Sequence, residues 1–418
     1  MSVSTMSPPI SVATGSARWF QLVLGLVAMM SISSPQYVWT LFTKPLQTSL
    51  GASLPAIQIT FSLLIVLQTF FSPLQGYLID KFGPRFLIAL GCVMSGAGWV
   101  ATAYISTLSG LYLTYGLLCG LGTGIVYVGI VGLMVRWFPD RRGFATGMVA
   151  AGYGFGAILT TFPIDTMIKA SGYQHTLVVF GLVLAVVGAL AALAMRMPAS
   201  TDVLPAPAVM TGSKDVKPGA MIRTPVFWLM FAMMTMMSTG GLMIISQFAA
   251  FSRAFGVADV VVLGMAALPL ALSIDRITNG LTRPFFGWVS DRIGRENTMA
   301  IAFLMEAVAV TAMLLCRNDA LLFALLSGVV FFGWGEIFSL FPSTLTDTFG
   351  TKHATTNYGV LYMAQGIGSV LGGPLAALLH DVTGTWMPVF IIIITMDTLT
   401  GLLAFFALKP LRKRYAAA

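Results

Sequence analysis

Long apolar segments alternate with short polar connections along almost the whole chain. A helix needs about 17–25 apolar residues to cross a bilayer. The segments of that length are 19–43, 56–79, 86–105, 109–135, 143–168 and 175–197, followed by 224–252, 259–288, 297–316, 319–345, 355–380 and 385–408. This pattern predicts an all-α membrane protein with twelve transmembrane helices.

The polar stretches divide these helices into two sets. The first residues are rich in Ser, Thr and Pro and lack the basic start and the cleavage site of a secretory signal, so we expect the first helix to be retained. We predict a disordered tail at 1–16, an N-terminal six-helix bundle at 17–197, a cytoplasmic linker at 198–222, a C-terminal six-helix bundle at 223–408 and a basic cytoplasmic tail at 409–418.

Composition supports the membrane prediction. The chain is 57% hydrophobic and 9% charged, with a mean hydropathy of +0.88, whereas a soluble domain carries about 25% charged residues. Of the 23 Lys and Arg residues, 17 lie in connections on one side and four on the other. Positive charge marks the cytoplasmic side, so we expect both termini to be cytoplasmic. The net charge of +8 then needs no nucleic-acid partner.

Other classes of function find little support. The three cysteines lie in apolar segments, the three histidines are far apart, and no phosphate-binding loop motif is present. We therefore expect no metal, no cofactor and no enzymatic activity. A receptor usually carries a soluble signalling domain, whereas the longest connection here has 25 residues.

An internal repeat links the two sets of helices. Residues 73–83 (PLQGYLIDKFG) match residues 284–294 (PFFGWVSDRIG) at an offset of 211, and each copy ends the second helix of its set. Repeated halves that rock about a central site are typical of secondary transporters. The lipid bilayer is thus the expected surrounding, and the substrate site is expected between the halves.

The eighth segment contains a polar seam. Asp275, Asn279 and Arg283 are four residues apart and so share one helix face, with Arg276 beside Asp275. A charge at bilayer depth costs about 2.5–3.5 kcal/mol on insertion scales, so we expect this face to line a cavity. Arg283 offers a planar fork to a carboxylate, and Asn279 could bind the same anion. The alternative is a structural ion pair between Arg283 and Asp275.

The repeated turn resembles the signature of the major facilitator superfamily. Its residues are Gly76, Asp80, Lys81, Gly83 and Arg85 in the first copy and Gly287, Asp291, Arg292, Gly294 and Arg295 in the second. An acidic residue at a helix end can pair with neighbouring helix termini or basic residues and so hold the cytoplasmic side closed. The alternative is a solvated turn.

A narrower resemblance is to the oxalate/formate antiporter family, related to the monocarboxylate transporters. The matching fragments are Gln36–Thr40, Asp80–Arg85, Arg136–Asp140, Ala151–Gly154, Arg283–Pro284 and Asn357–Gly359. The resemblance implies a bacterial inner-membrane carrier in which Arg283 binds the substrate carboxylate. It also implies that aromatic side chains line the cavity, namely Tyr37, Tyr127, Tyr153, Trp334, Phe338 and Tyr362, and that the phenols and the indole among them donate hydrogen bonds to the anion. Ordinary packing or an interfacial belt is the alternative for these rings.

One departure from that family concerns the eleventh helix, where its oxalate carriers have a lysine and this chain has Gln365. Loss of a cation disfavours a dianion in a low-dielectric pocket. The negative charges of Asp275 and Glu336 offset the positive charges of Arg276 and Arg283, so the cavity is expected to be formally neutral. Because a buried carboxyl group can carry a proton, Asp275 and Glu336 are the candidate proton sites. An internal salt bridge with Arg276 is the alternative for both acids.

Two further acids, Glu306 and Asp397, are expected to make helix–helix or interfacial hydrogen bonds. Taken together, these features lead us to expect carriage of a short monocarboxylate of the lactate, pyruvate or formate type together with a proton. Oxalate/formate exchange, or carriage of another small organic acid, is the alternative.

Overall fold

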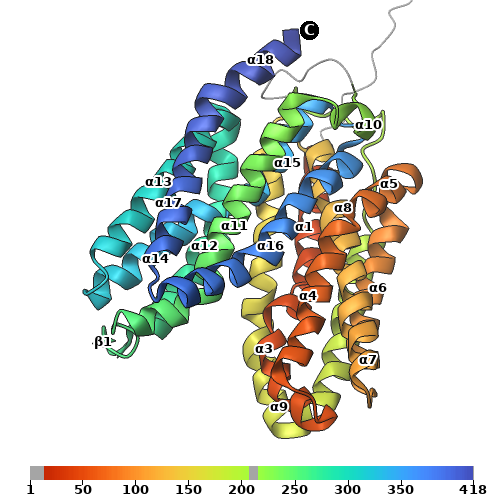
Figure 1. Cartoon of the computed structure of the whole chain (residues 1–418). Coiled ribbons are helices and arrows are strands. Elements are labelled where there is room, and N and C mark those ends of the chain that lie inside the picture. Colours follow the sequence, from red (N-terminus) through yellow and green to blue (C-terminus); the bar gives the residue numbers. More distant parts are fainter. Residues whose placement is uncertain (1–13, 207–214, 418) are drawn as a thin grey trace, which may run out of the picture.

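A computed structural model describes residues 14–206 and 215–417, which form two helical bundles joined by the linker (Figure 1). The predicted tail at 1–16 and linker at 198–222 therefore lie partly outside the described residues. The elements of the first half are α1 (Thr14–Ser31), α2 (Ser34–Tyr37), α3 (Trp39–Leu50), α4 (Leu54–Phe70), α5 (Ser72–Phe82), α6 (Pro84–Thr102), α7 (Leu108–Leu111), the π-helix η1 (Tyr112–Cys119), α8 (Gly120–Trp137) and α9 (Arg142–Leu193).

The second half follows the linker and repeats this arrangement. Its elements are α10 (Pro218–Met221), α11 (Pro225–Ala254), β1 (Val261–Val262), β2 (Met265–Ala266), α12 (Ala267–Ile293), α13 (Arg295–Leu315), α14 (Ala320–Trp334), α15 (Ile337–Phe349), α16 (Ala354–Thr383), α17 (Met387–Leu403), the π-helix η2 (Ala404–Leu408) and α18 (Lys409–Ala417). The predicted basic tail is thus helical as far as Ala417.

The number of membrane crossings agrees with twelve. Within the described ranges, nine helices are long and apolar enough to cross a membrane, and the pair α4–α5, bent by 46°, makes another crossing. Helix α9 has 52 residues and crosses twice, because Gly172 (φ 82°, ψ 163°) breaks its helical path. Helix α12, which has 27 residues and carries the polar seam, is the twelfth crossing in this count.

The start of the eighth helix was predicted too early. We expected a helix from residue 259, but α12 begins at Ala267, after a short antiparallel hairpin of β1 and β2. Leu263 and Gly264, between the strands, have φ values of 52° and 82°. Positive φ at both central residues of a turn favours a hairpin and is incompatible with a continuing helix.

The two halves cross at the motif glycines. Helix α5 packs against α16 and α12 packs against α9. A Cβ atom at Gly76 would lie 2.8 Å from Thr356 Cα, and one at Gly287 would lie 2.9 Å from the Phe144 backbone nitrogen. Because glycine has no side chain, the backbones approach closely at both crossings, and the halves meet at the end of the molecule that carries the linker.

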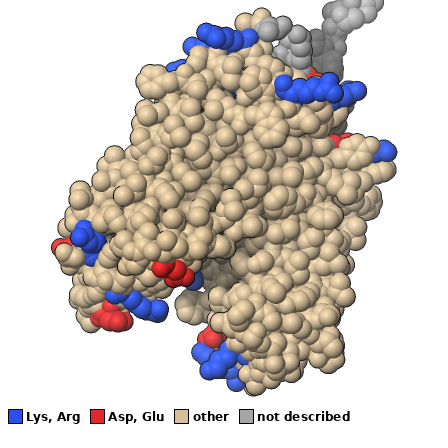
Figure 2. Space-filling view, in the orientation of Figure 1, with Lys and Arg blue, Asp and Glu red and all other residues tan. Residues whose placement is uncertain are grey.

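We call this end, which carries α10 and α18, the linker face. At the opposite end the bundles diverge (Figure 1), and the space-filling surface is hollowed between them (Figure 2). Charged side chains gather toward the two ends in this view, whereas the band between them shows almost no charged side chains. That distribution fits a membrane belt around the middle of the molecule.

Candidate functional site

Arg283 is a buried cation without an acidic partner in the described chain. Its side chain is on α12, its exposed fraction is 2%, and it makes no ion pair with any residue that the structure describes. Its Nη1 donates to the Ala150 carbonyl of α9 at 2.5 Å, and its Nη2 donates to Asn279 Oδ1 at 2.9 Å. Its Nε has no hydrogen-bond partner in the described chain. A guanidinium has five N–H donors, so donors remain for an anion.

A connected group of aromatic rings, which we call the aromatic cage, lies against this cation. We define it by the rings of Tyr37, Tyr127, Tyr153, Trp334, Phe338, Tyr358 and Tyr362. The guanidinium carbon lies 4.8 Å from the centre of the Phe338 ring, and Tyr127 stacks on Tyr362 with ring centres 4.9 Å apart. The ring of Tyr127 also packs edge-on against that of Tyr153, and the ring of Tyr153 packs in the same way against that of Tyr37. The ring centres are 5.4 Å apart in each pair.

Both halves contribute to the cage. Tyr37, Tyr127 and Tyr153 come from α2, α8 and α9 of the first half, whereas the remaining rings come from α14, α15 and α16 of the second. Tyr37 is 42% exposed and forms the outer limit of the cage, while Tyr127 is 1% exposed. The fold thus brings the predicted arginine, Asn279 and all six predicted aromatic residues to one place between the bundles.

One predicted site residue, Trp334, differs from expectation in its polar contacts. The indole N–H of Trp334 donates to the Met237 carbonyl at 2.9 Å. Trp334 therefore contributes its ring but no donor, and the prediction that this indole hydrogen-bonds an anion is wrong in this structure. Gln365 lies three residues after Tyr362 on α16, and its Oε1 is buried without a partner in the described chain.

Sequence reasoning missed three polar members of the site. Gln36 Oε1 accepts from the Tyr153 hydroxyl at 2.6 Å, and Gln68 Nε2 donates to the Tyr362 oxygen at 3.1 Å. The Tyr358 hydroxyl is buried and has no partner within the described ranges. Gln36 and Tyr358 belong to the fragments that carry the family resemblance, but nothing in their spacing indicates that they face the cavity.

The acids of the eighth helix and its neighbour are placed differently from each other. Asp275 Oδ1 accepts from Ser327 Oγ at 2.9 Å, while its Oδ2 has no partner in the described chain. Arg276 is exposed, and in the part of the chain that the structure describes it forms no ion pair with Asp275 or Glu336. The alternatives of an Arg283–Asp275 pair and of a salt bridge with Arg276 are therefore not observed.

Glu336 lies between α14 and α15, fully buried, and neither of its carboxylate oxygens has a partner in the described residues. It lies within electrostatic range of Arg283 and Asp397. Glu306 lies within electrostatic range of Glu336 and Asp397. The prediction that Glu306 and Asp397 make helix–helix or interfacial hydrogen bonds is wrong. Both are fully buried, and their carboxylate oxygens have no partner within the described segments.

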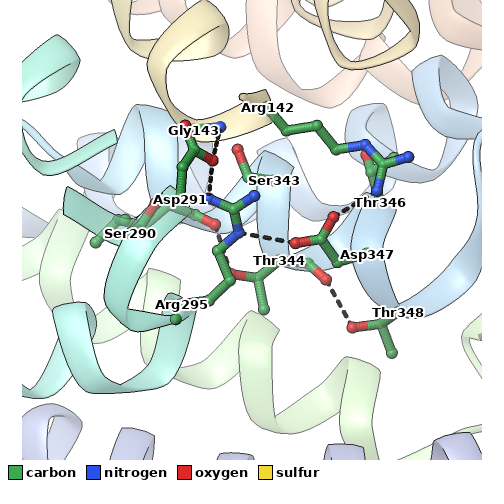
Figure 3. A network of polar contacts seen from close by, with 12 residues as sticks. Arg142, Gly143, Ser290, Asp291, Arg295, Ser343, Thr344, Thr346, Asp347 and Thr348 are labelled. Carbon is green, nitrogen blue, oxygen red and sulfur yellow. Dashed lines mark hydrogen bonds and ion pairs between the residues drawn. The ribbon is translucent and has the colours of Figure 1, made fainter. Parts of the chain in front are cut away.

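A buried ion network joins the halves at the linker face (Figure 3). Asp347 of α15 accepts from Arg142 Nη1 of α9 at 2.5 Å and from Arg295 Nε of α13 at 2.8 Å. Arg295 Nη1 in turn donates to Asp291 Oδ1 at 2.6 Å, and Asp291 accepts from the backbone N–H groups of Gly143 and Phe144, each at 2.9 Å. Asp291 thus caps the start of α9 from the opposite half.

The first copy of the motif makes the equivalent contact with α16. Asp80 Oδ2 accepts from the Thr356 backbone N–H at 2.8 Å and from its hydroxyl at 2.6 Å, while Oδ1 accepts from Arg136 Nη2 at 2.5 Å. Arg136 also donates to the carbonyls of Thr351 and Lys352 at 2.9 and 3.1 Å. The motif aspartates therefore lie at helix starts and next to basic residues, as the motif predicts; the gating role stays a prediction.

Three basic motif residues lie outside both networks. Lys81, Arg85 and Arg292 are exposed, and each lies over an aromatic ring of its own helix. Gly83 and Gly294 end their helices with φ values of 89° and 94°. Arg295 directly follows Gly294, whereas Arg85 is two residues after Gly83. Arg295 is buried and pairs with Asp291, whereas Arg85, one position further along, is exposed. In the first half the partner of Asp80 is therefore Arg136 of α8 and not Arg85.

Comparisons with known proteins give consistent matches. A family model described as Major Facilitator Superfamily matches residues 22–278 and 266–417. The chain is 36% identical over 402 residues to the oxalate:formate antiporter of Oxalobacter formigenes, covering 95% of this chain and 94% of that protein. It is 24% identical to monocarboxylate transporter 13 of Bos taurus, covering 81% of this chain and 77% of that protein.

Among solved structures, the proton:xylose symporter XylE bound to 6-bromo-6-deoxy-D-glucose has the same fold. The TM-score is 0.73, the sequence identity is 13%, and the match covers 94% of this chain and 96% of that one. At this identity the likeness concerns the arrangement of the helices alone.

Proposed function

Because the chain belongs to the major facilitator superfamily and is a secondary transporter, we propose that it carries a short monocarboxylate with a proton. Its relatives and its fold are those of multi-pass membrane transporters and not of enzymes.

The observation that carries the proposal is that the buried Arg283 forms no ion pair in the described chain. A buried cation without a counter-ion is strongly unfavourable in a low-dielectric interior. Arg283 lies between the halves, donates across them to Ala150, and keeps an unused Nε–H. A carboxylate bound here would neutralise the guanidinium and use its free donors. The site therefore favours an anionic cargo.

The charge of the site favours a monoanion. Among the described residues, Arg283 is the cation that contacts the aromatic cage, and the position that carries a lysine in the oxalate carriers is the neutral Gln365. The other polar groups of the cage are phenols and amides. A second carboxylate would remain unpaired, and an unpaired buried charge is costly.

Glu336 is the proton site that we favour over Asp275. Its carboxylate oxygens have no donor in the described chain, and it lies within electrostatic range of Arg283, whereas Asp275 is hydrogen-bonded to Ser327. A carboxyl group in such a place exchanges a proton in response to the charge nearby. Arrival of an anion at Arg283 would then be linked to protonation of Glu336.

The linker face is the cytoplasmic side in this proposal, with both termini inside a bacterial inner membrane. The excess of Lys and Arg supports this orientation. The structure has a closed linker face and a hollow at the other end. We infer that it corresponds to a state open toward the outside.

Exchange of oxalate for formate is the second candidate. It is favoured by the 36% identity to the Oxalobacter formigenes antiporter over nearly the full length of both proteins. In that case the dianion would bind with Arg283 as its single buried cation.

The deciding experiment uses the full chain reconstituted in proteoliposomes. An inward proton gradient should drive accumulation of labelled lactate or formate, whereas uptake that requires internal oxalate would support exchange. Arg283→Gln should abolish uptake, because it removes the charge that neutralises the anion. Arg253→Gln, at an exposed arginine in the last turn of α11, is the control and should transport normally. Full transport by the Arg283 variant would refute the proposed site.

A further inference from the structure

Tyr358 is a buried residue of the aromatic cage, and its hydroxyl has no hydrogen-bond partner in the described residues. It is 1% exposed and lies on α16, one turn before Tyr362. A buried tyrosine hydroxyl normally finds a partner, and leaving a buried donor unsatisfied costs about 1–3 kcal/mol. The unpaired hydroxyl therefore indicates a partner that is a ligand.

The surroundings of Tyr358 place it beside the proposed carboxylate site. Its ring centre is 5.6 Å from that of Tyr362, and it lies within electrostatic range of Arg283. Its hydroxyl lies close to the hydroxyl of Tyr127, but the two form no hydrogen bond of normal length and angle. The Tyr362 oxygen accepts from Gln68 Nε2 at 3.1 Å. Because Gln68 supplies that hydrogen, the hydrogen of the Tyr362 hydroxyl itself has no acceptor in the described chain. Two neighbouring phenols on one helix thus have donors to spare.

Resting on the proposed carboxylate site, we propose that Tyr358, assisted by Tyr362, donates a hydrogen bond to an oxygen on C2 of the cargo. Arg283 holds the carboxylate at the other end. The unused N–H bonds of the guanidinium suffice for both carboxylate oxygens, which leaves the phenols for the adjoining group. The site then selects short 2-oxo acids, 2-hydroxy acids or singly ionised dicarboxylic acids over unsubstituted acids of the same size.

The basis of this selection is the unpaired donor. An acid without a C2 oxygen would place a methylene group against Tyr358 and leave the buried hydroxyl unsatisfied. Sites built to hydrogen-bond a substrate oxygen reject analogues that lack it much more strongly than apolar pockets reject a missing methylene. We therefore expect at least a tenfold difference in affinity between two acids that differ only in this oxygen.

Pyruvate and propionate provide such a pair, because they differ by a carbonyl in place of a methylene. Their dissociation constants are measured with the full-length protein, in detergent and in proteoliposomes. The unmodified protein should bind pyruvate at least tenfold more tightly. Tyr358→Phe keeps the ring and removes the hydroxyl, so it should weaken pyruvate binding to the level of propionate and leave propionate binding unchanged. Tyr362→Phe should lower the ratio less.

Tyr112→Phe is the matched control. Its hydroxyl donates to the Ala56 carbonyl at 2.8 Å within the first half, away from the cage, so the pyruvate-to-propionate ratio should be unaffected. Equal binding of the two acids by the unmodified protein would overturn the role of Tyr358 and leave the carboxylate site intact. A parallel loss of both acids in Tyr358→Phe would show a packing role and overturn it as well. If neither acid binds the unmodified protein, both this inference and the proposed function fail.

Discussion

The contact between Arg142 and Asp347 gives the sharpest prediction about the closed linker face. The two side chains are 3% and 1% exposed, and their ion pair joins α9 of the first half to α15 of the second. Asp347 also pairs with Arg295, but that contact lies within the second half. Opening of the linker face must break the first pair and can keep the second.

The change Asp347→Asn removes both ion pairs and keeps the side-chain shape. The loss of the Arg295 contact affects the open and closed states equally, so only the Arg142 contact alters their balance. A hydrogen bond between charged groups contributes about 1.5–3 kcal/mol. We therefore expect the ratio of open to closed linker face to rise by a factor of about 10 to 100. Arg142→Gln should produce a similar shift, and the double variant should add little to either.

The assay is the distance distribution between spin labels placed on the two halves at the linker face, in nanodiscs without cargo. Asp202→Asn is the control, because Asp202 forms a two-bond pair with Arg196 at the same end, at 2.6 and 2.9 Å, without joining the halves. An unchanged distance distribution in Asp347→Asn, or an equal shift in Asp202→Asn, would refute the inference that the Arg142–Asp347 ion pair stabilises the closed linker face.

Three further predictions concern cargo, coupling and closure. Gln365→Lys adds a cation near the cage and should raise the affinity for oxalate relative to lactate at least tenfold, measured by competition; an unchanged ratio contradicts the charge argument. Glu336→Gln should abolish proton-driven accumulation and retain exchange of labelled for unlabelled cargo, whereas Asp275→Asn should retain both; loss of coupling in the Asp275 variant alone would reverse the assignment. Gly287→Ala places a Cβ 2.9 Å from the Phe144 nitrogen, so it should prevent full closure of the linker face, measured by cysteine labelling from that side; full protection would show that the helices can adjust.

The order of the twelve crossings was predictable because hydropathy is a local property of the chain. The repeat at 73–83 and 284–294 likewise showed from the sequence alone where the halves correspond. The start of α12 was not predicted. Leu263 is apolar and Gly264 is small, so hydropathy does not distinguish them from residues of a transmembrane helix, although both adopt left-handed backbone conformations that end a helix. Turn geometry, and not hydropathy, decides where that helix begins.

The site was predicted in its cation and its rings but not in its hydrogen bonds. Arg283 is conspicuous because it is charged within an apolar segment, whereas Gln68 and Tyr358 are ordinary residues whose role depends on contacts between distant helices. Glu306 was misjudged for a related reason. Its position on the ninth crossing indicated the periphery, but its side chain points toward α14, where a Cβ at Gly333 would lie 2.7 Å from Glu306 Cβ. The direction of a side chain is settled by packing.

Helix α16 connects the linker face with the cage and so constrains the proposed transport cycle. Thr356 contacts Asp80 at the linker face, while Tyr358 and Tyr362 belong to the cage. Six residues of helix span about 9 Å, so these contacts move together unless the helix bends between them. Opening of the linker face separates α16 from α5 and must also pull Tyr362 from its stack on Tyr127. Because Arg283 and both phenols lie in the second half, the cargo should remain bound to that half while the first half moves away.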